Sequence, residues 1–253
     1  MHVKPKKSLG QHFLTDENIA KKIVNGLSKN DYVLEIGPGT GVLTKYLIQS
    51  TENLKLIEID QESVAFLEST YPEIKSKIIN ADFLHFDISK LFMEEFAIIG
   101  NFPYNISSQI FFKIIENRHK IPEVIGMIQK EVAERLAAPP GNKIYGILTV
   151  ILGAFYEIKY LFTVSENVFN PPPRVKSAVV KLIRKEKFTL DCNEKFFMRV
   201  VKTAFNQRRK TLRNSLKSML PVGFDHTQHH IFTKRPEQLG LDGFLLLTNL
   251  LSK

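Results

Sequence analysis

Short apolar runs recur through the first half of the chain, and each is followed by a stretch of mixed polar and apolar residues. The runs cover residues 32–36, 54–59, 77–80, 96–99 and 124–128. Runs of this length fit buried strands, and their alternation with amphipathic stretches is typical of a mostly parallel sheet with crossover helices. We therefore expect an α/β domain.

The stretches between the runs carry helix signals. Residues 40–49 follow a glycine turn, and residues 61–69 follow an acidic strand end. Residues 109–117 come after Ser107 and Ser108, which are good N-cap residues. Each of the three stretches is predicted to be a crossover helix.

The pattern is less regular after residue 138. Residues 139–142 are typical of a loop, and the apolar stretch 147–164 does not distinguish helix from strand by its periodicity. We expect this stretch to complete the sheet domain. The three prolines at 171–173 force extended backbone before the apolar run 177–183, which is predicted to be the last strand.

The sequence changes character near residue 185. Between residues 196 and 220, apolar side chains such as Phe197, Val201 and Leu212 stand at helical spacing, which predicts one long helix. The segments that follow are short and helical. We predict a sheet domain over residues 1–184 and a small α-helical C-terminal domain over residues 185–253.

The net charge of +9 is unevenly distributed along the chain. Residues 1–170 carry 18 Lys and Arg against 20 Asp and Glu, whereas residues 171–253 carry 17 against 6. A basic face of this kind attracts phosphates, so nucleic acid is the first partner to consider. A merely solubilising surface fits the charge equally well.

Composition disfavours several other classes of protein. The single cysteine, Cys192, cannot form an internal disulfide, and no Cys or His partner stands near it at metal-ligand spacing. His226, His229 and His230 lack acidic or cysteine companions, so no metal site is expected. No run approaches the roughly 18 apolar residues of a membrane span. We expect a cytoplasmic protein without membrane association.

A glycine-rich turn separates the first predicted strand from the first predicted crossover helix. Gly37, Gly39 and Gly41 stand in the sequence EIGPGTG, and glycines there let the backbone approach a ligand and point amides at it. Val42 occupies the position of the third glycine in the dinucleotide-binding pattern. Phosphate binding is therefore not the expected purpose of the turn.

Carboxylates follow the next two strands. Glu58 is placed to accept both hydroxyl hydrogens of a ribose, and Asp82 to accept from the N6 amine of an adenine. A strand-end cap or an ion pair is the plainer alternative for Glu58 or Asp60, and a turn residue is the plainer alternative for Asp82. With Gly37, these positions describe an adenosine bound without phosphates. The arrangement resembles the class I (Rossmann-like) methyltransferases, which implies S-adenosyl-L-methionine as the cofactor.

The fourth strand ends in the motif Asn101-Phe102-Pro103-Tyr104. The lone pair of an adenine N6 amine is delocalised, so the amine needs acceptors that hold its hydrogens and turn the lone pair toward a methyl donor. The Asn101 side-chain oxygen and the Phe102 or Pro103 carbonyl are suitable acceptors, and Tyr104 offers a stacking face for a flipped base. A proline turn with two core aromatics is the alternative.

Four separated motifs together resemble one family. They are the Asn101 motif and the segments 7–14 (KSLGQHFL), 167–177 (NVFNPPPRVKS) and 207–216 (QRRKTLRNSL). The chain is similar over nearly its whole length to the rRNA adenine N6-dimethyltransferases, and within them to the KsgA/RsmA branch that acts on small-subunit (16S) rRNA. This branch dimethylates two adjacent adenosines in the hairpin loop near the 3′ end of that rRNA during ribosome assembly.

The resemblance implies roles for further residues. Residues 11–14 fold over the cofactor, with Gln11, His12 and Leu14 at contacting positions, and Asn101 borders both cofactor and target amine. Phe169 sandwiches the target adenine against Tyr104. His12 stands where asparagine is common in the family, which puts the polar contact at that position in doubt.

The basic C-terminal region is interpreted as the RNA-binding surface, because phosphate contacts position an RNA. We expect RNA contacts from Arg174, Lys176, Arg208, Arg209, Lys210 and Arg213. The partners implied are small-subunit rRNA and the assembling 30S-type particle, with the chain acting as a monomer. Two alternatives are an erythromycin-resistance-type enzyme acting on large-subunit rRNA and a ribosome-assembly factor without catalysis.

Overall fold

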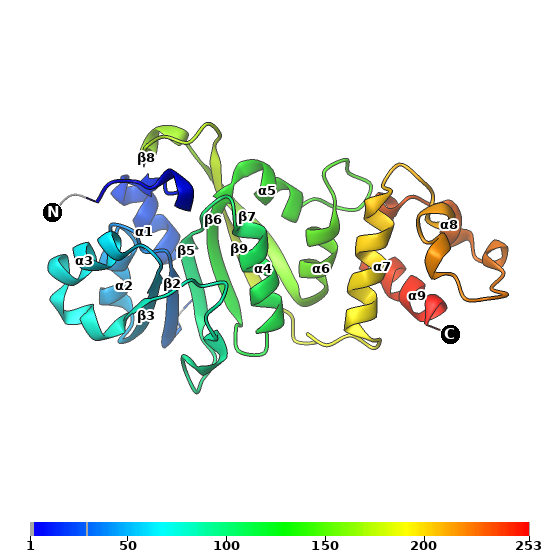
Figure 1. Ribbon diagram of the computed structural model, residues 1–253, viewed down its shortest axis with the longest axis horizontal. Helices are drawn as coiled ribbons and strands as arrows, with labels where there is room; N and C mark the ends of the chain where they lie inside the picture. Colours follow the sequence, from blue (N-terminus) through cyan, green and yellow to red (C-terminus); the bar gives the residue numbers. More distant parts are fainter. Residues whose placement is uncertain (1–2, 29, 253) are drawn as a thin grey trace. The chain divides into compact units, whose positions relative to one another are not determined.

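The central element of the computed structural model is a seven-stranded sheet, and the model describes residues 3–28 and 30–252 (Figure 1). β2, β3, β4, β5 and β6 pair in parallel, and β9 runs antiparallel to β6. In spatial order the strands are β4 (Ile78–Asn80), β3 (Asn53–Glu58), β2 (Tyr32–Ile36), β5 (Ala97–Asn101), β6 (Glu123–Gln129), β9 (Ser177–Arg184) and β7 (Tyr156–Val164). The predicted α/β class with a mostly parallel sheet is confirmed.

Helices alternate with the parallel strands. In chain order they are α1 (Glu17–Asn25), α2 (Thr44–Ser50), α3 (Gln61–Thr70) and α4 (Ser107–Glu116), followed by α5 (Lys130–Leu136). α1 begins at Asp16, whose carboxylate accepts from the N–H groups of Asn18 and Ile19 at 2.8 and 2.9 Å. Ser107 does not cap α4, because its hydroxyl donates to the Tyr104 carbonyl at 3.3 Å.

The sheet is covered on both faces, which explains its near-continuous apolar strands. On one face, Val33, Leu56 and Ile99 join a core cluster with side chains of α1 and α2. The opposite face carries Phe102 at the end of β5, which meets Phe111 of α4 edge-on, with ring centroids 5.9 Å apart. Neighbouring side chains on a strand point to opposite faces, so each strand serves both cores.

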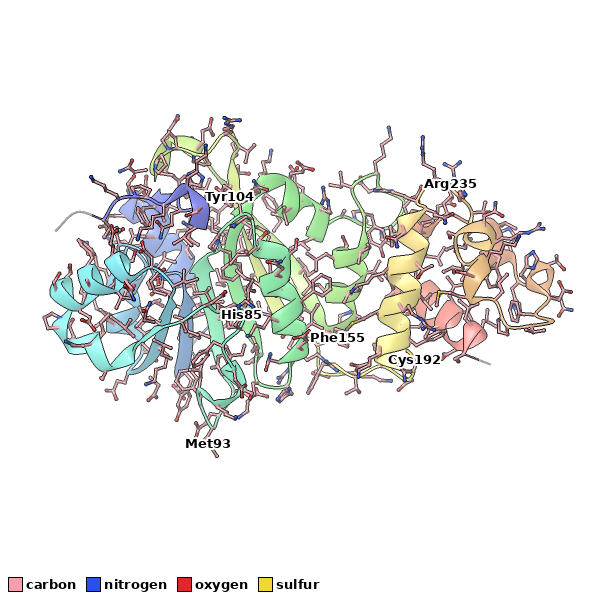
Figure 2. All side chains as sticks on the ribbon, viewed as in Figure 1. His85, Met93, Tyr104, Phe155, Cys192 and Arg235 are labelled. Carbon is pink, nitrogen blue, oxygen red and sulfur yellow. The ribbon has the colours of Figure 1, made fainter. Side chains whose placement is uncertain are left out.

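The apolar stretch 147–164, left open by periodicity, is a helix followed by a strand. α6 (Ile147–Phe155) ends at the fully buried Phe155 (Figure 2), and β7 begins at Tyr156. The backbone becomes extended at Tyr156, just before charged residues begin to alternate with apolar ones. A stretch that is apolar throughout gives no periodic signal to mark such a boundary.

The chain divides into two compact units. The first comprises residues 1–133 and 158–184, and the second comprises residues 134–157 and 185–253. In the second unit, α6 packs with α7 (Glu194–Asn206) and α9 (Leu241–Leu251). Residues 134–157, which the expected division placed with the sheet, therefore belong with the C-terminal helices.

The single helix predicted over residues 196–220 is wrong. α7 ends at Asn206, a turn follows in which the Lys210 N–H bonds to the Gln207 carbonyl, and α8 (Leu212–Ser215) begins after Thr211. The N–H of Leu212 bonds to the Lys234 carbonyl, a long-range contact that replaces the continuing helix. Among the described helices, none is long and apolar enough to cross a lipid bilayer.

Gly126 of β6 offers a test of the packing of the Phe102 ring against the sheet. An added Cβ would lie 2.5 Å from the Phe102 ring, so we expect Gly126→Ala to lower the free energy of unfolding by about 1–3 kcal/mol. Gly153 in α6 is the matched control, because nothing lies within 4 Å of its added Cβ. Gly153→Ala should stabilise by roughly 0.5–1 kcal/mol through helix propensity. Urea denaturation measures both, and a neutral Gly126→Ala would contradict the packing.

Candidate functional site

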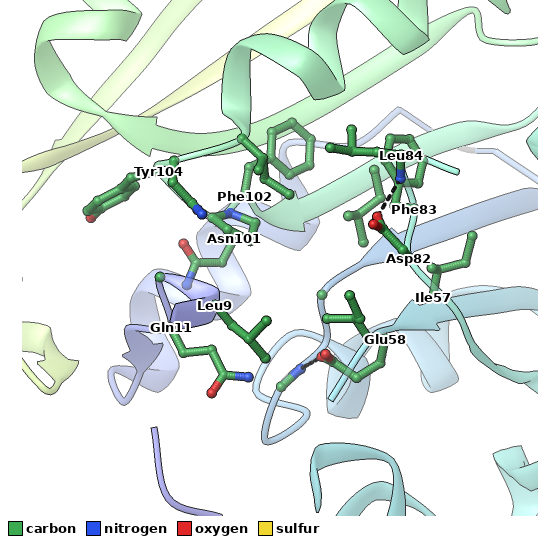
Figure 3. Close-up of a pocket in the computed structure, with 18 of the residues that line it drawn as sticks. Leu9, Gln11, Ile57, Glu58, Asp82, Phe83, Leu84, Asn101, Phe102 and Tyr104 are labelled. Atoms are coloured by element: carbon green, nitrogen blue, oxygen red, sulfur yellow. Dashed lines mark hydrogen bonds between the residues drawn. The ribbon is translucent and has the colours of Figure 1, made fainter. Parts of the chain in front are cut away.

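A cavity of about 250 Å³ opens where β2, β3 and β5 end (Figure 3). Because parallel strands end at the same edge, residues distant in sequence converge there. Ten predicted site residues line it, namely Gln11, His12, Gly37, Gly39, Glu58, Asp82, Asn101, Phe102, Pro103 and Tyr104. No Lys or Arg is among its described lining residues.

The three glycines of the turn approach the cavity, but their own N–H groups are already bonded. Gly37, Gly39 and Gly41 all have positive φ, at +63°, +56° and +79°. Their N–H groups bond within the protein, to the Ile57 carbonyl, the Glu58 carboxylate and the Pro38 carbonyl. An added Cβ on Gly37 would meet nothing within 4 Å. The predicted close approach fits Gly37, whereas the expectation that the turn points its amides at a ligand is wrong.

Glu58 is held by the turn that it faces. Its carboxylate accepts from the N–H of Gly39 at 3.0 Å (Figure 3). It also accepts from the N–H of Asp60 at 2.9 Å. Burial raises the pKa of this carboxyl, although the backbone hydrogen bonds oppose the shift. Each carboxylate oxygen keeps a second lone pair, so Glu58 can still accept from a ligand hydroxyl.

Asp82 lies on the far side of the cavity, after β4. Burial disfavours its charge, but hydrogen bonds from His85 and from the Leu84 N–H, both at 2.8 Å, outweigh burial and lower the pKa. Asp82 is therefore an ionised acceptor. The apolar walls between the two carboxylates, which the sequence reasoning did not single out, are Ile57, Ile59, Phe83 and Leu84.

Hydrogen bonds orient the Asn101 motif. The Asn101 side-chain N–H donates to the His12 carbonyl at 2.8 Å, which leaves the side-chain oxygen as the free end of the amide. The Pro103 carbonyl accepts from the Ile106 N–H at 3.2 Å, whereas the Phe102 carbonyl has no hydrogen-bond partner among the described residues. Of the two carbonyls considered from the sequence, Phe102 is thus the available acceptor.

A strap of N-terminal residues, 5–14, borders the cavity. Lys6 forms an ion pair with Asp60 at 2.5 Å, and the Gln11 side chain bridges the Lys6 N–H and the Asp60 carboxylate at 2.8 and 3.1 Å. Gln11 thus fastens the strap as well as lining the cavity. Asp60 is 2% exposed and receives these contacts just after β3, so it forms the ion pair considered as the plainer alternative at this strand end.

Leu14 and Phe169 do not line the main cavity, although Leu14 lines a small cavity of about 20 Å³ with Gly37, Gly39 and Asn101. Leu14 and Phe169 pair across the short strands β1 (Phe13–Leu14) and β8 (Phe169–Asn170) and are 3% and 4% exposed in the core cluster. Neither lines the main cavity. Tyr104, by contrast, does line it, and its hydroxyl bonds to the buried Ser177 at 2.6 Å.

The predicted RNA-contacting residues fall on both units. Arg174 and Lys176 are exposed in the first unit, directly before β9. Arg209, Lys210 and Arg213 are exposed in the second, between α7 and the end of α8. Arg208 is half-buried and donates to the Asn142 carbonyl at 3.2 Å. Within residues 3–28 and 30–252, no cluster of His, Cys, Asp and Glu suits a metal ion.

Glu35 is a buried acid that the sequence reasoning did not assign. It is 1% exposed at the end of β2, and its carboxyl accepts from the Thr44 hydroxyl at 2.7 Å. Burial raises its pKa to about 8, the hydrogen bond from Thr44 opposes the rise, and Glu58 adds to it. Glu35 is therefore predominantly protonated at pH 7 and braces the first turn of α2.

Known proteins resemble the chain over nearly its full length. The family model described as "Ribosomal RNA adenine dimethylase" matches residues 2–242. A relative from Flavobacterium johnsoniae, named "Ribosomal RNA small subunit methyltransferase A", is 59% identical over 97% of this chain and 95% of its own. A relative of the same name from Parabacteroides distasonis is 56% identical over 97% and 93%.

Solved structures agree with these matches. A dimethyladenosine transferase from Plasmodium falciparum is 28% identical with a TM-score of 0.80, over 95% of this chain and 98% of its own. The 23S rRNA methyltransferase ErmE is 27% identical with a TM-score of 0.68, over 95% and 100%.

Glu35 predicts a pH dependence of stability. Its folded pKa lies above the unfolded value of 4.5, so the folded state binds more protons between these values, and the free energy of unfolding falls as pH rises from about 5 to 8. Glu35→Gln keeps the acceptor for Thr44 and should remove this loss, gaining up to a few kcal/mol at pH 8. Thermal unfolding across pH 5–8.5 measures the difference.

Glu123 is the matched control, because its pKa is shifted in the opposite direction from that of Glu35. Burial opposes its ionisation, but hydrogen bonds from Lys181, Ser28 and Asn30 outweigh burial and lower the pKa. Glu123→Gln should therefore lower the free energy of unfolding at neutral pH. In the wild type, the contribution of Glu123 is lost as pH falls through its folded pKa, and the variant should not show this loss. Parallel pH profiles for wild type and Glu35→Gln would contradict the assignment of Glu35.

Proposed function

The chain belongs to the ribosomal RNA adenine dimethylase family, and from this we propose that it methylates the N6 amines of adenosines in small-subunit ribosomal RNA, with S-adenosyl-L-methionine as the methyl donor. The relatives named for the small-subunit enzyme are 52–59% identical. The large-subunit enzyme ErmE is 27% identical, so the large-subunit alternative is not favoured.

The cavity fits the cofactor by the chemistry of its lining. Two carboxylates, Glu58 and Asp82, face a cavity without lysine or arginine, and the glycine amides are already bonded. These carboxylates repel phosphates and accept hydrogen bonds from hydroxyl and amino groups. A nucleoside without phosphates offers such groups. Glu58 would hold the ribose, Asp82 the adenine amine, and Gly37 would admit the methionine portion beside the backbone.

S-adenosyl-L-methionine supplies an electrophilic methyl group when it is bound. The protein's task is to hold and orient the target amine. The Asn101 side-chain oxygen and the Phe102 carbonyl accept the two amine hydrogens and turn the nitrogen lone pair away from the adenine ring. After the first methylation, one N–H hydrogen remains and one acceptor still holds it. This scheme requires no general base, because the methylated nitrogen releases its proton afterwards.

The observation that carries the proposal is the orientation of Asn101. Its amide N–H is bound to the His12 carbonyl, so the oxygen and not the nitrogen is the free end, and the Phe102 carbonyl is unpaired beside it. Two acceptors and no competing donor in adjacent residues suit a primary amine bearing two hydrogens. A turn with a merely structural role would not need both groups unpaired.

We further propose that the targets are two adjacent adenosines in the 3′-terminal hairpin loop, modified on the assembling 30S-type particle. The first unit, residues 1–133 and 158–184, would supply catalysis, and the basic C-terminal residues would hold the RNA. We propose a monomer acting in the cytoplasm, where small subunits are assembled. Leu14 and Phe169 would support the site from the core through β1 and β8, since both are buried there.

The direct test incubates the purified protein with labelled S-adenosyl-L-methionine and small subunits that lack the modification. We expect N6-dimethyladenine in the small-subunit rRNA, detected by mass spectrometry after nuclease digestion. Asn101→Ala should lower the rate about 100-fold or more through loss of alignment. Asn105→Ala, which alters the same residue type in the lining of the same cavity, should stay within a few-fold. Absence of the product with wild type would overturn the enzymatic proposal.

The basic residues after α7 give a separate prediction. Because phosphate contacts set the salt dependence of RNA affinity, Arg209→Glu with Arg213→Glu should weaken binding and reduce the logarithmic salt slope by roughly one to two. Cofactor affinity should not change. Lys75→Glu with Lys90→Glu is the control, since it makes the same charge change on exposed side chains of the first unit. Equal salt slopes for the two double variants would contradict the proposed RNA surface.

A further inference from the structure

The segment that follows β4 forms one wall of the cavity. Ala81, Asp82, Phe83 and Leu84 all line it, and Figure 3 shows Asp82 and Leu84 on the opposite side of the cavity from Tyr104. β4 is three residues long and lies at the edge of the sheet, with β3 as its neighbour. A wall carried by a short edge strand depends on contacts from outside the sheet to keep its place.

Hydrogen bonds within the segment fold it into a compact turn. The Asp82 carbonyl accepts from the N–H groups of His85 and Phe86 at 3.1 and 3.0 Å, and the Asp82 carboxylate accepts from the Leu84 N–H at 2.8 Å. The carbonyls of Leu84 and Phe86 accept from no backbone N–H among the described residues. Two backbone acceptors of the turn are thus left for a partner from elsewhere in the fold.

Lys113 of α4 is that partner. Its half-buried side chain donates from Nζ to the Leu84 carbonyl at 2.9 Å and also to the Phe86 carbonyl. The same Nζ lies 5.3 Å from the centroid of the Phe83 ring, which is 4% exposed. A lysine ammonium has three donors and no acceptor, so most of its hydrogen-bonding capacity is used on this turn.

α4 begins just after the Asn101 motif, so Lys113 connects two walls of the cavity. Ser107, the first residue of α4, donates to the Tyr104 carbonyl at 3.3 Å. In the sheet, β3 and β2 lie between β4 and β5, so no strand pairing joins the segment after β4 to the motif after β5. Lys113 joins them directly, from the helix of one to the turn of the other.

We propose that Lys113 is a positioning residue, which holds the carbonyls of Leu84 and Phe86 and thereby sets where the Asp82 carboxylate stands toward the adenine of the cofactor. The inference rests on the proposed function, in which Asp82 accepts from the adenine amine. Lys113 does not line the cavity, so it acts through the turn and not by touching the cofactor. Loss of its donors removes the hydrogen bonds from α4 that hold the turn.

Lys120 is a matched control within the same unit. Its Nζ donates to the Phe92 carbonyl at 3.3 Å and also to the Met93 carbonyl, which is the same kind of contact with a different loop. Neither Phe92 nor Met93 lines the cavity, and Figure 2 shows Met93 far from Tyr104. Removing the Lys120 donors therefore measures the cost of losing such a contact without a change at the cavity.

Calorimetric titration with two cofactor analogues tests the inference. S-adenosyl-L-homocysteine carries the adenine amine, and S-inosyl-L-homocysteine has an oxygen in its place, so the ratio of their Kd values measures recognition of the amine. Lys113→Met keeps the apolar stem and removes the donors. We expect it to weaken S-adenosyl-L-homocysteine about tenfold, the effect of one lost hydrogen bond, and S-inosyl-L-homocysteine less than about twofold. Lys120→Met should leave both Kd values within about twofold of wild type, because its loop is remote.

A double substitution determines whether Lys113 acts through Asp82. Asp82→Ala removes the acceptor, so adding Lys113→Met should then weaken S-adenosyl-L-homocysteine by less than about twofold. A full loss in both backgrounds overturns the inference, since Lys113 would then act independently of Asp82. Thermal unfolding identifies misfolded variants. If Lys113→Met does not fold, Lys113→Arg takes its place, because it keeps the charge on a differently shaped end, and it should lower the ratio about two- to fivefold.

The inference and the proposed function fail differently. If wild type discriminates between the analogues and Lys113→Met discriminates equally, the role of Lys113 is overturned, even where the variant unfolds at a lower temperature. If wild type binds both analogues equally, the adenine role of Asp82 is overturned and the inference falls with it. Absence of N6-dimethyladenine, with the expected loss of discrimination in Lys113→Met, overturns the proposed methylation and supports the role of Lys113.

Discussion

The parallel pairing of β2, β3 and β5 is the constraint on which the site depends. Parallel strands end at a common edge, so Gly37, Glu58 and Asn101, which follow three separate strands, face one cavity. The sheet is buried on both faces, and its glycines at 100 and 126 leave room for the Phe102 ring beside β5 and β6. The packing of the Phe102 ring against the sheet thus fixes the position of the Phe102 carbonyl at the cavity.

Two neighbouring cavities of the first unit differ in the charge of their lining residues. The cavity that suits the cofactor contains Glu58 and Asp82 and no basic lining residue, whereas the neighbouring cavity contains Lys7 and Arg174. By its charge, the first cavity suits a nucleoside that bears no phosphate, and the neighbouring cavity suits a polyanionic strand. The buried Glu35 stays predominantly neutral behind the glycine turn, so it adds little to the negative charge around Glu58.

The parallel sheet and the position of Glu58 could be predicted from the sequence. Strands buried in a parallel sheet have a distinct apolar pattern, and Glu58 is the last residue of one such strand. The division of 147–164 into α6 and β7 could not, since a wholly apolar stretch has no period. The break after α7 depends on a bond between Leu212 and Lys234, and the burial of Phe169 depends on its pairing with Leu14. The stacking of His12 on Tyr104 is likewise a contact between distant segments, on which local pattern carries no information.

The short β1–β8 pair has a consequence for the order in which the protein is completed. Residues 13–14 pair with residues 169–170, and His12 bonds to Pro171, so the strap lacks its strand partner until about two thirds of the chain has been synthesised. The bond from Asn101 to the His12 carbonyl unites the strap with the motif at the end of β5. A nascent chain that has not reached residue 171 therefore has only Asp60 and Asn101 to hold the strap, and the β1–β8 pair that completes its attachment is added late.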